Sequence, residues 1–378
     1  MASPLNRPYL SLANLLLIVA TGFVVVLLWQ LRSLLVTLMI AVVLAAAIAP
    51  LVDIAEKWRF KRWLAVISVY LSLIATLVGA GLVIGPTLAT QIENLARSIP
   101  QYLDDLWELI ERSALKQGIT QPEALQFFDL QGLSGWVLGS GQQLVIRSYD
   151  LTTGVLGAVL NLILALLLSG YMVAGRENLI QGLVNLFPHP WNERLADQVQ
   201  PIARRMGGYI QGRVLVSAIL GVAITLGLGI LGLSEFALAL GAIAGFTNLI
   251  PFVGPILGAV PALIVAVSQG GWTFLWVLLL FVIIQNLETY VLDPLLVGSS
   301  VRVHPLYQLL AVLGGTQVLG ITGAVIIPPW IAGASVLLEN LYIRPKLLAE
   351  GKANIVAAPV KSASEALPID SSKLQGKA

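Results

Sequence analysis

The chain has 378 residues, of which 57% are hydrophobic and only 11% are charged. Because soluble domains carry about 25% charged residues, this composition indicates an integral membrane protein. The formal net charge of +2 gives no indication of nucleic-acid binding. The sequence contains no cysteine, which excludes thiol catalysis, disulfide bonds and cysteine-ligated metal sites.

Three apolar runs open the chain, at residues 10–29, 34–52 and 63–88, and each is long enough to cross a bilayer. The first run exceeds the apolar region of a signal peptide, so we expect a retained helix. The second and third runs flank a short basic loop, which the positive-inside rule places in the cytoplasm. Residues 1–90 therefore form an N-terminal group of transmembrane helices. The basic residues of the loop are Lys57, Arg59, Lys61 and Arg62.

Residues 91–150 form the first sizeable polar segment, with more acidic than basic side chains. Apolar residues recur in its first half at spacings of three or four, which predicts an amphipathic helix. We interpret the segment as an extracytoplasmic, solvated extension with no functional site of its own. The periodic residues are Ile92, Leu95, Ile99, Leu103, Leu106 and Ile110.

Residues 151–213 are expected to bring the chain back to the cytoplasm through a span at residues 153–173. The polar part that follows is rich in arginine and has a second amphipathic pattern, so we predict a helix laid against the cytoplasmic membrane surface or against a neighbouring helix. Arg204, Arg205 and Arg213 are interpreted as anchors at this interface.

A span at residues 214–233 leads to an apolar run, residues 236–268, in which the stretch 248–262 holds three prolines and two glycines. Proline removes a backbone donor and clashes with the preceding turn, so a straight helix is not expected. The run is either a kinked spanning helix or a re-entrant hairpin that lines a transport path. Its length exceeds the roughly 20 residues of one span but is too short for two spans and a turn, which favours the hairpin.

A second interrupted run, residues 306–342, follows a span at residues 272–290, and its length also favours a hairpin. With one span between them, the two hairpins would enter from opposite faces, as in alternating-access carriers. We assign residues 214–343 to a transport core and residues 344–378 to a disordered cytoplasmic tail. The run holds Gly314, Gly315, Gly320, Gly323, Pro328 and Pro329.

The predicted fold is all-α and polytopic. It has about six full transmembrane helices and two broken or re-entrant helical hairpins, which make eight membrane segments. An even number of crossings places both termini in the cytoplasm.

The first interrupted run resembles the signature of the autoinducer-2 exporter family of bacterial membrane proteins. Two other stretches are similar to family motifs: Gln285, Glu288 and Pro294 with the loop that follows to Leu306, and Gly208-Tyr209 with Gly212. The resemblance implies an export permease in the bacterial plasma membrane, working as a homo-oligomer, a pentamer, with elevator-like movement. The residues that match the signature are Asn248, Pro251, Phe252, Gly254, Pro255, Gly258, Pro261 and Ala262.

Two groups of residues are candidates for function. An acid near a helix interior costs at least roughly 2.5 kcal/mol at mid-bilayer, so Glu288 is a candidate site for a coupling proton, Na⁺ or cargo, with Gln285 on the same helical face. The alternative is that Glu288 faces water at a helix end. The second group is the transport pathway through the hairpins, where exposed backbone groups bind cargo. It comprises Asn248, Pro251, Phe252, Gly254, Pro255, Gly258, Pro261, Gly314, Gly315, Gly320 and Gly323.

We interpret the chain as an ion-coupled secondary exporter of a small hydrophilic molecule such as autoinducer-2, embedded in the lipid bilayer. The alternatives are an ion antiporter of the Na⁺/H⁺ type and a membrane scaffold or assembly protein without flux. The segment from Gly315 to Gly320 lacks the lysine of a P-loop, and both histidines precede proline, so no His-Glu-x-x-His motif exists. An enzyme, a cofactor and a metal site are therefore not expected.

Overall fold

The computed structural model describes residues 12–116, 148–270, 272–298 and 304–351. All secondary-structure elements within those residues are helices, which confirms the all-α prediction. The second half of the predicted extracytoplasmic segment and most of the predicted tail lie outside the described residues.

Five of the described helices are long and apolar enough to cross a membrane, and a sixth span results if the bent pair α6–α7 counts as one. The axes of that pair differ by 84°. Three shorter apolar helices accompany them: α9, α10 and the part of α1 from Leu15 to Gln30. In chain order the elements are α1 (Leu12–Gln30), α2 (Arg32–Lys57), α3 (Arg62–Lys116), α6 (Ser148–Ala174), α7 (Arg176–Val184), α8 (Trp191–Ile230), α9 (Ala237–Thr247), α10 (Gly254–Ser268), α11 (Thr273–Leu287), the π-helix η1 (Glu288–Val297), α12 (Pro305–Leu337), the π-helix η2 (Leu338–Ile343) and α13 (Arg344–Ala349).

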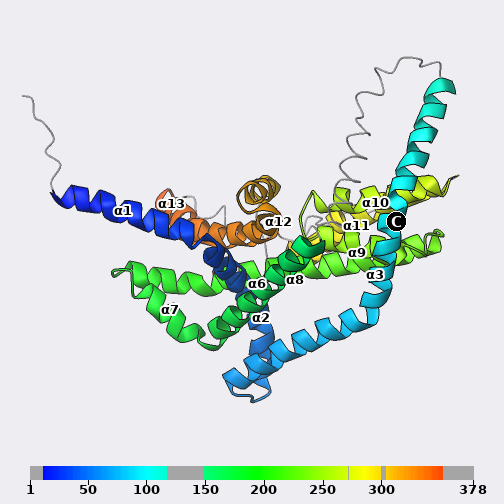
Figure 1. Ribbon diagram of the computed structural model, residues 1–378. Helices are drawn as coiled ribbons and strands as arrows, with labels where there is room; N and C mark the ends of the chain where they lie inside the picture. The colour runs from blue at the N-terminus through cyan, green and yellow to red at the C-terminus, as the bar shows by residue number, and fades with distance from the viewer. Residues whose placement is uncertain (1–11, 117–147, 271, 299–303, 352–378) are drawn as a thin grey trace, which may run out of the picture.

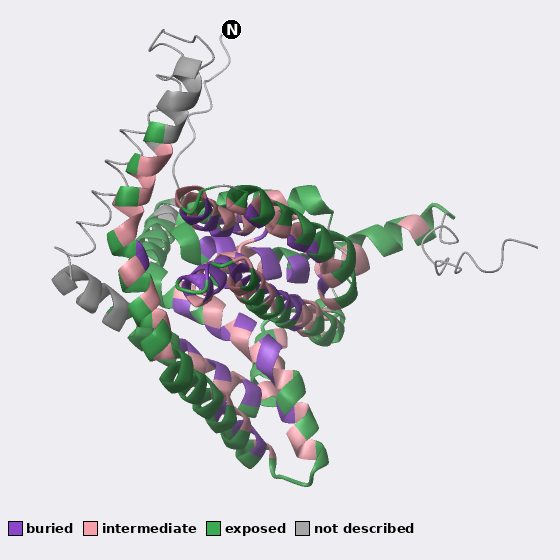
Figure 2. Ribbon diagram, turned by 90° about the vertical axis from the view of Figure 1, so that its right-hand side faces the viewer, coloured by how far each residue is buried: buried purple, intermediate pink, exposed green. Residues whose placement is uncertain are grey.

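Helix α8 is the central element, and α2, α9, α12 and η1 pack against it (Figure 1). Its buried apolar side chains recur every four residues or so and form a continuous stripe, because residues four apart share one helical face. This stripe meets the buried residues of α9, α10 and α11 in the largest hydrophobic cluster. Figure 2 shows the buried residues gathered where these central helices meet. The stripe on α8 consists of Val216, Leu220, Ile224 and Leu228.

Helix α3 continues without a break from the third apolar run into the polar segment. The amphipathic helix is therefore confirmed, but its interpretation as a solvated extension is wrong for the part next to the membrane. Leu95 is only 3% exposed and belongs to the main hydrophobic cluster. The side-chain Oε1 of Gln91 accepts a hydrogen bond from the backbone N–H of Ala239, in the first turn of α9 (3.0 Å). One face of α3 thus supports the first interrupted run.

The first interrupted run consists of two packed helices, α9 and α10, rather than one kinked helix. At 1.5 Å per residue, the 11 residues of α9 are too few to cross a bilayer core of about 30 Å. Pro251 lies in the turn between the helices, and Pro255 occupies the first turn of α10, where its missing N–H costs nothing. Phe252 has a φ of 65°, which is rare for a bulky residue and marks the sharp reversal.

The second interrupted run is also a hairpin, formed by the two halves of α12. The chain turns at Gly320, whose φ of 64° and ψ of −148° lie in a region that only glycine occupies readily. A Cβ added to Gly315 would overlap the carbonyl oxygen of Gly323, and the reverse is also true. Residues eight apart in a straight helix are about 12 Å apart along the axis, so this contact requires that the two halves fold back on each other.

Candidate functional site

Three buried polar side chains meet beside the turn of the first hairpin. Arg213 comes from α8, Asn248 follows the last residue of α9, and Glu288 begins η1. Their exposed fractions are 4%, 2% and 3%. Elements far apart in the sequence therefore bring a cation, an amide and an anion into one place that solvent does not reach.

Hydrogen bonds connect this cluster. Nη1 of Arg213 donates to Oε1 of Glu288 (2.9 Å), and Nδ2 of Asn248 donates to the same oxygen (3.1 Å). Nη2 of Arg213 donates to Oδ1 of Asn248 at 3.4 Å, which closes a triangle of contacts. Nε2 of Gln285 reaches the other carboxylate oxygen of Glu288 (3.3 Å), and Asp293 accepts a longer bond from Nη1 of Arg213 (3.4 Å).

The π-helix η1 places the two acids on the side of α8. Pro294 lies inside this element and has no N–H to donate, so the regular helical bonding is interrupted. The backbone N–H of Gly298 instead donates to the carbonyl of Asp293, five residues earlier (2.6 Å). Such widened turns occur frequently at functional sites.

The ion pair has an energetic cost that its amide contacts reduce. Taking both charges out of water is unfavourable, and attraction compensates only when further hydrogen bonds satisfy the remaining donors and acceptors. Glu288 receives such bonds from Asn248 and Gln285. The hydrogen bonding of Arg213 is less complete, because its buried Nε has no hydrogen-bond partner among the residues that the structure describes.

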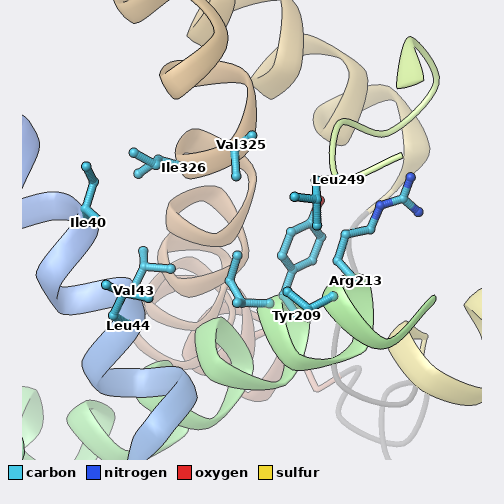
Figure 3. A pocket seen from close by; sticks show the side chains of 10 residues that line it. Ile40, Val43, Leu44, Tyr209, Arg213, Leu249, Val325 and Ile326 are labelled. Atoms are coloured by element: carbon cyan, nitrogen blue, oxygen red, sulfur yellow. The ribbon is translucent and has the colours of Figure 1, made fainter. Parts of the chain in front are cut away.

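A cavity of about 150 Å³ lies next to this cluster. Its walls come from α2, α8, the turn of the first hairpin and the second half of α12 (Figure 3). In Figure 3 the stem of Arg213 borders the cavity beside Tyr209, and its guanidinium extends away from the wall formed by α2. The remaining lining is apolar: Ile40, Val43, Leu44, Ile210, Val214, Leu249, Val325 and Ile326.

The two residues proposed for coupling, Gln285 and Glu288, lie together. Gln285 contacts Glu288, and Asn248 joins them from the first hairpin. The alternative in which Glu288 faces water is wrong, because its exposed fraction is 3%. The interpretation of Arg213 as an interface anchor is also wrong, since its side chain is buried and paired with Glu288.

None of the predicted pathway residues is among the residues that line the cavity. Gly254 and Gly258 lie inside the first hairpin, where an added Cβ would overlap the backbone of Thr247 and Ala244. Pro251, Phe252, Pro255 and Pro261 shape the same hairpin, whereas Gly314 is exposed. The cavity is lined by neighbours of these residues: Leu249, Val325 and Ile326.

Sequence reasoning missed Arg213, Tyr209 and the α2 wall. Arg213 directly follows Gly212 and precedes a long apolar run, so it has the sequence context of an interfacial arginine. The apolar lining residues of α2 have the composition of any spanning helix, and no local signal separates them from residues that face lipid.

Comparison with known proteins now identifies the family. A family model described as "AI-2E family transporter" matches residues 15–343. The chain belongs to this family. It is therefore a multi-pass membrane protein of a bacterial transporter family, and the prediction that it is not an enzyme is confirmed by that membership.

Individual proteins also resemble the chain over most of its length. The Bacillus subtilis (strain 168) protein YueF, provisionally named a transport protein, is 26% identical over 86% of this chain and 88% of its own. YrrI of the same strain, named in the same way, is 28% identical over 85% of this chain and 92% of its own. The Escherichia coli (strain K12) protein named AI-2 transport protein TqsA is 24% identical over 88% of this chain and 94% of its own.

Proposed function

We propose that this protein is a secondary carrier that exports a small hydrophilic molecule, with autoinducer-2 as one candidate cargo. The observation that carries the proposal is the composition of the cavity wall. Both interrupted hairpins contribute to it, together with α2 and α8, and the cavity adjoins the buried Arg213 and Glu288. Elements that are broken within a membrane and enclose a cavity with buried charges are typical of carriers.

Glu288 is the proposed binding site for a coupling proton or Na⁺, with Gln285 and Asn248 as its hydrogen-bond donors. In the present conformation Arg213 occupies the position of the counter-charge. A bound cation would compete with Arg213 for the carboxylate, which links cation binding to movement of η1 relative to α8. We also propose that the two hairpins enter from opposite faces of the plasma membrane, that both termini are cytoplasmic and that the protein forms a homo-oligomer, a pentamer by family resemblance.

Labelling of single cysteines tests the pathway, since the chain has no cysteine of its own. We expect Leu249→Cys to react with a membrane-impermeant thiol reagent from both sides of sealed vesicles, because an alternating cavity opens to each side in turn. Gly254 and Gly258 are unsuitable positions, because their added side chains would disrupt the hairpin. Val277→Cys, at a position with 0% exposure in α11, is the control that should not react. Absence of labelling from either side would support the scaffold alternative.

Glu288→Gln tests the coupling proposal. The substitution keeps the shape of the side chain but removes the charge that a cation would bind. We expect export to become insensitive to imposed proton or Na⁺ gradients, measured as flux in vesicles with and without each gradient. Glu93→Gln removes an exposed acid of similar type and should leave the gradient dependence intact. Unchanged gradient dependence in Glu288→Gln would reject this assignment.

A further inference from the structure

The transport core contains two copies of one structural pattern, at residues 254–298 and 304–349. Each copy has a proline in the first turn of a helix, a glycine with positive φ and a second helical stretch that passes into a π-helix. A Leu-Glu pair lies at that transition, and a proline follows six residues after the glutamate. Equivalent positions are displaced by 50 or 51 residues. The pairs are Pro255 and Pro305, Gly270 and Gly320, Glu288 and Glu339, and Pro294 and Pro345.

The two equivalent glutamates both bind arginines of α8. Glu288 pairs with Arg213 at 2.9 Å, and Oε2 of Glu339 lies 3.3 Å from Nη1 of Arg205. Arg205 also donates to Oγ of Ser335 (3.1 Å), at the end of α12. The two arginines are eight residues apart, about 12 Å along the helix axis. The second hairpin is thus attached to α8 in the same way as η1.

The second ion pair fixes a wall of the cavity. Val325 and Ile326 line the cavity from the second half of α12. Further along this half, a Cβ added to Gly333 would lie 2.8 Å from the side chain of Met206 on α8. Glu339 follows six residues after Gly333 and contacts Arg205. This half of α12 therefore forms one side of the cavity as long as it stays packed on α8.

The two ion pairs differ in how easily they separate. The side chains of Arg213 and Glu288 are each 4% exposed, so separating them would leave charges buried without a partner. Arg205 and Glu339 are 19% and 26% exposed, and water solvates them more readily on separation. Glu339 also has a second partner, Arg344, at 3.4 Å, so it keeps an ion pair after it leaves Arg205.

We infer that Arg205 and Glu339 form a latch that holds the second half of α12 against α8, and that opening this latch exposes the cavity. This inference rests on the proposed carrier function. Arg205 and Glu339 are positioning residues, because neither lines the cavity. The buried pair of Arg213 and Glu288 remains closed during this step.

The rate of thiol labelling at Val325→Cys in the purified full-length protein tests the latch with a maleimide as the probe. We expect Arg205→Gln to increase this rate about fivefold, the effect of losing a partly exposed ion pair. Arg205→Lys retains the charge and should label within about twofold of the parent. Glu339→Gln should also increase the rate, and combining the two should add little, because both variants break the same ion pair between Arg205 and Glu339.

Two controls separate a latch from general loosening. Arg204→Gln changes the exposed neighbouring arginine and should leave the rate unchanged. Val277→Cys reports a fully buried position in α11, and its labelling should not rise with Arg205→Gln. An unchanged rate at Val325→Cys, or a parallel rise at Val277→Cys, would overturn the latch. If Arg205→Gln fails to insert, Glu339→Gln supplies the same comparison.

The latch and the carrier function are separate proposals, and different results reject each of them. Labelling of Leu249→Cys from both sides, together with an Arg205→Gln rate equal to that of the parent, rejects the latch and leaves the carrier in place. No labelling of Leu249→Cys from either side rejects the carrier function, whatever the effect of Arg205→Gln.

Discussion

Arg213→Met is expected to lower the stability of the protein by roughly 3–5 kcal/mol and to abolish export. The substitution removes the cation but leaves Glu288 buried, with only the amides of Asn248 and Gln285 as donors. Asp293 loses its contact with Arg213 as well. Breaking a buried pair by removing one partner costs far more than the pair contributes, because the remaining charge is desolvated without compensation. The measurements are the thermal midpoint in detergent and flux in vesicles.

The stability of Glu288→Gln is to be compared with that of Arg213→Met. Glu288→Gln leaves Arg213 with Asp293 at 3.4 Å and with Oδ1 of Asn248, so its loss of stability should be smaller than that of Arg213→Met. The double variant Arg213→Met with Glu288→Leu removes both buried charges and should recover much of the stability, since apolar replacements of buried pairs are often tolerated. Export should remain absent in the double variant. Recovery of export would show that the ion pair only stabilises the fold and has no part in transport.

The two hairpins could be predicted from sequence because proline and glycine act locally. Pro251 lies in the turn between α9 and α10, and Pro255 stands in the first turn of α10. The length of the run then decides between one span and a hairpin. The structure confirms both interruptions, at the turn after α9 and at Gly320. The same local reasoning gave the amphipathic pattern of α3 but not its packing, because a periodic apolar face does not reveal whether it meets water, lipid or another helix.

The candidate site could be predicted only in part, because its partners come from distant segments. Glu288 and Gln285 were found because an acid inside an apolar helix is costly and its neighbour lies three residues away. The partner of Glu288 is Arg213, 75 residues earlier on α8, and no rule of local spacing connects the two. Apolar cavity residues such as Val325 are of the same types as the residues of any membrane helix, so the sequence does not single them out. Whether a charge is buried depends on the tertiary structure. The sequence indicates it only where a charged residue stands in an apolar helix, because such a position is costly without a partner.

Gly315→Ala is expected to disrupt the second hairpin, whereas Gly314→Ala should stabilise it slightly. The added Cβ of Gly315→Ala would overlap the carbonyl oxygen of Gly323, so the two halves of α12 must move apart. Overpacking of this kind costs typically about 1–3 kcal/mol. Gly314 has no atom within 4 Å of an added Cβ, and alanine is favoured over glycine in a helix by up to about 1 kcal/mol. The thermal midpoints of the two variants should therefore shift in opposite directions.

The effect on transport separates the hairpin's geometry from its stability. If the close approach of Gly315 and Gly323 sets the position of the cavity wall, Gly315→Ala should lose export even at temperatures where the protein remains folded. Gly323→Ala should reproduce this loss, because its added Cβ would overlap the carbonyl oxygen of Gly315 from the opposite side. Gly314→Ala should retain export, since its side chain points into open space. Normal export in both Gly315→Ala and Gly323→Ala would mean that the halves of α12 separate without consequence, and the second hairpin would then have no role in forming the pathway.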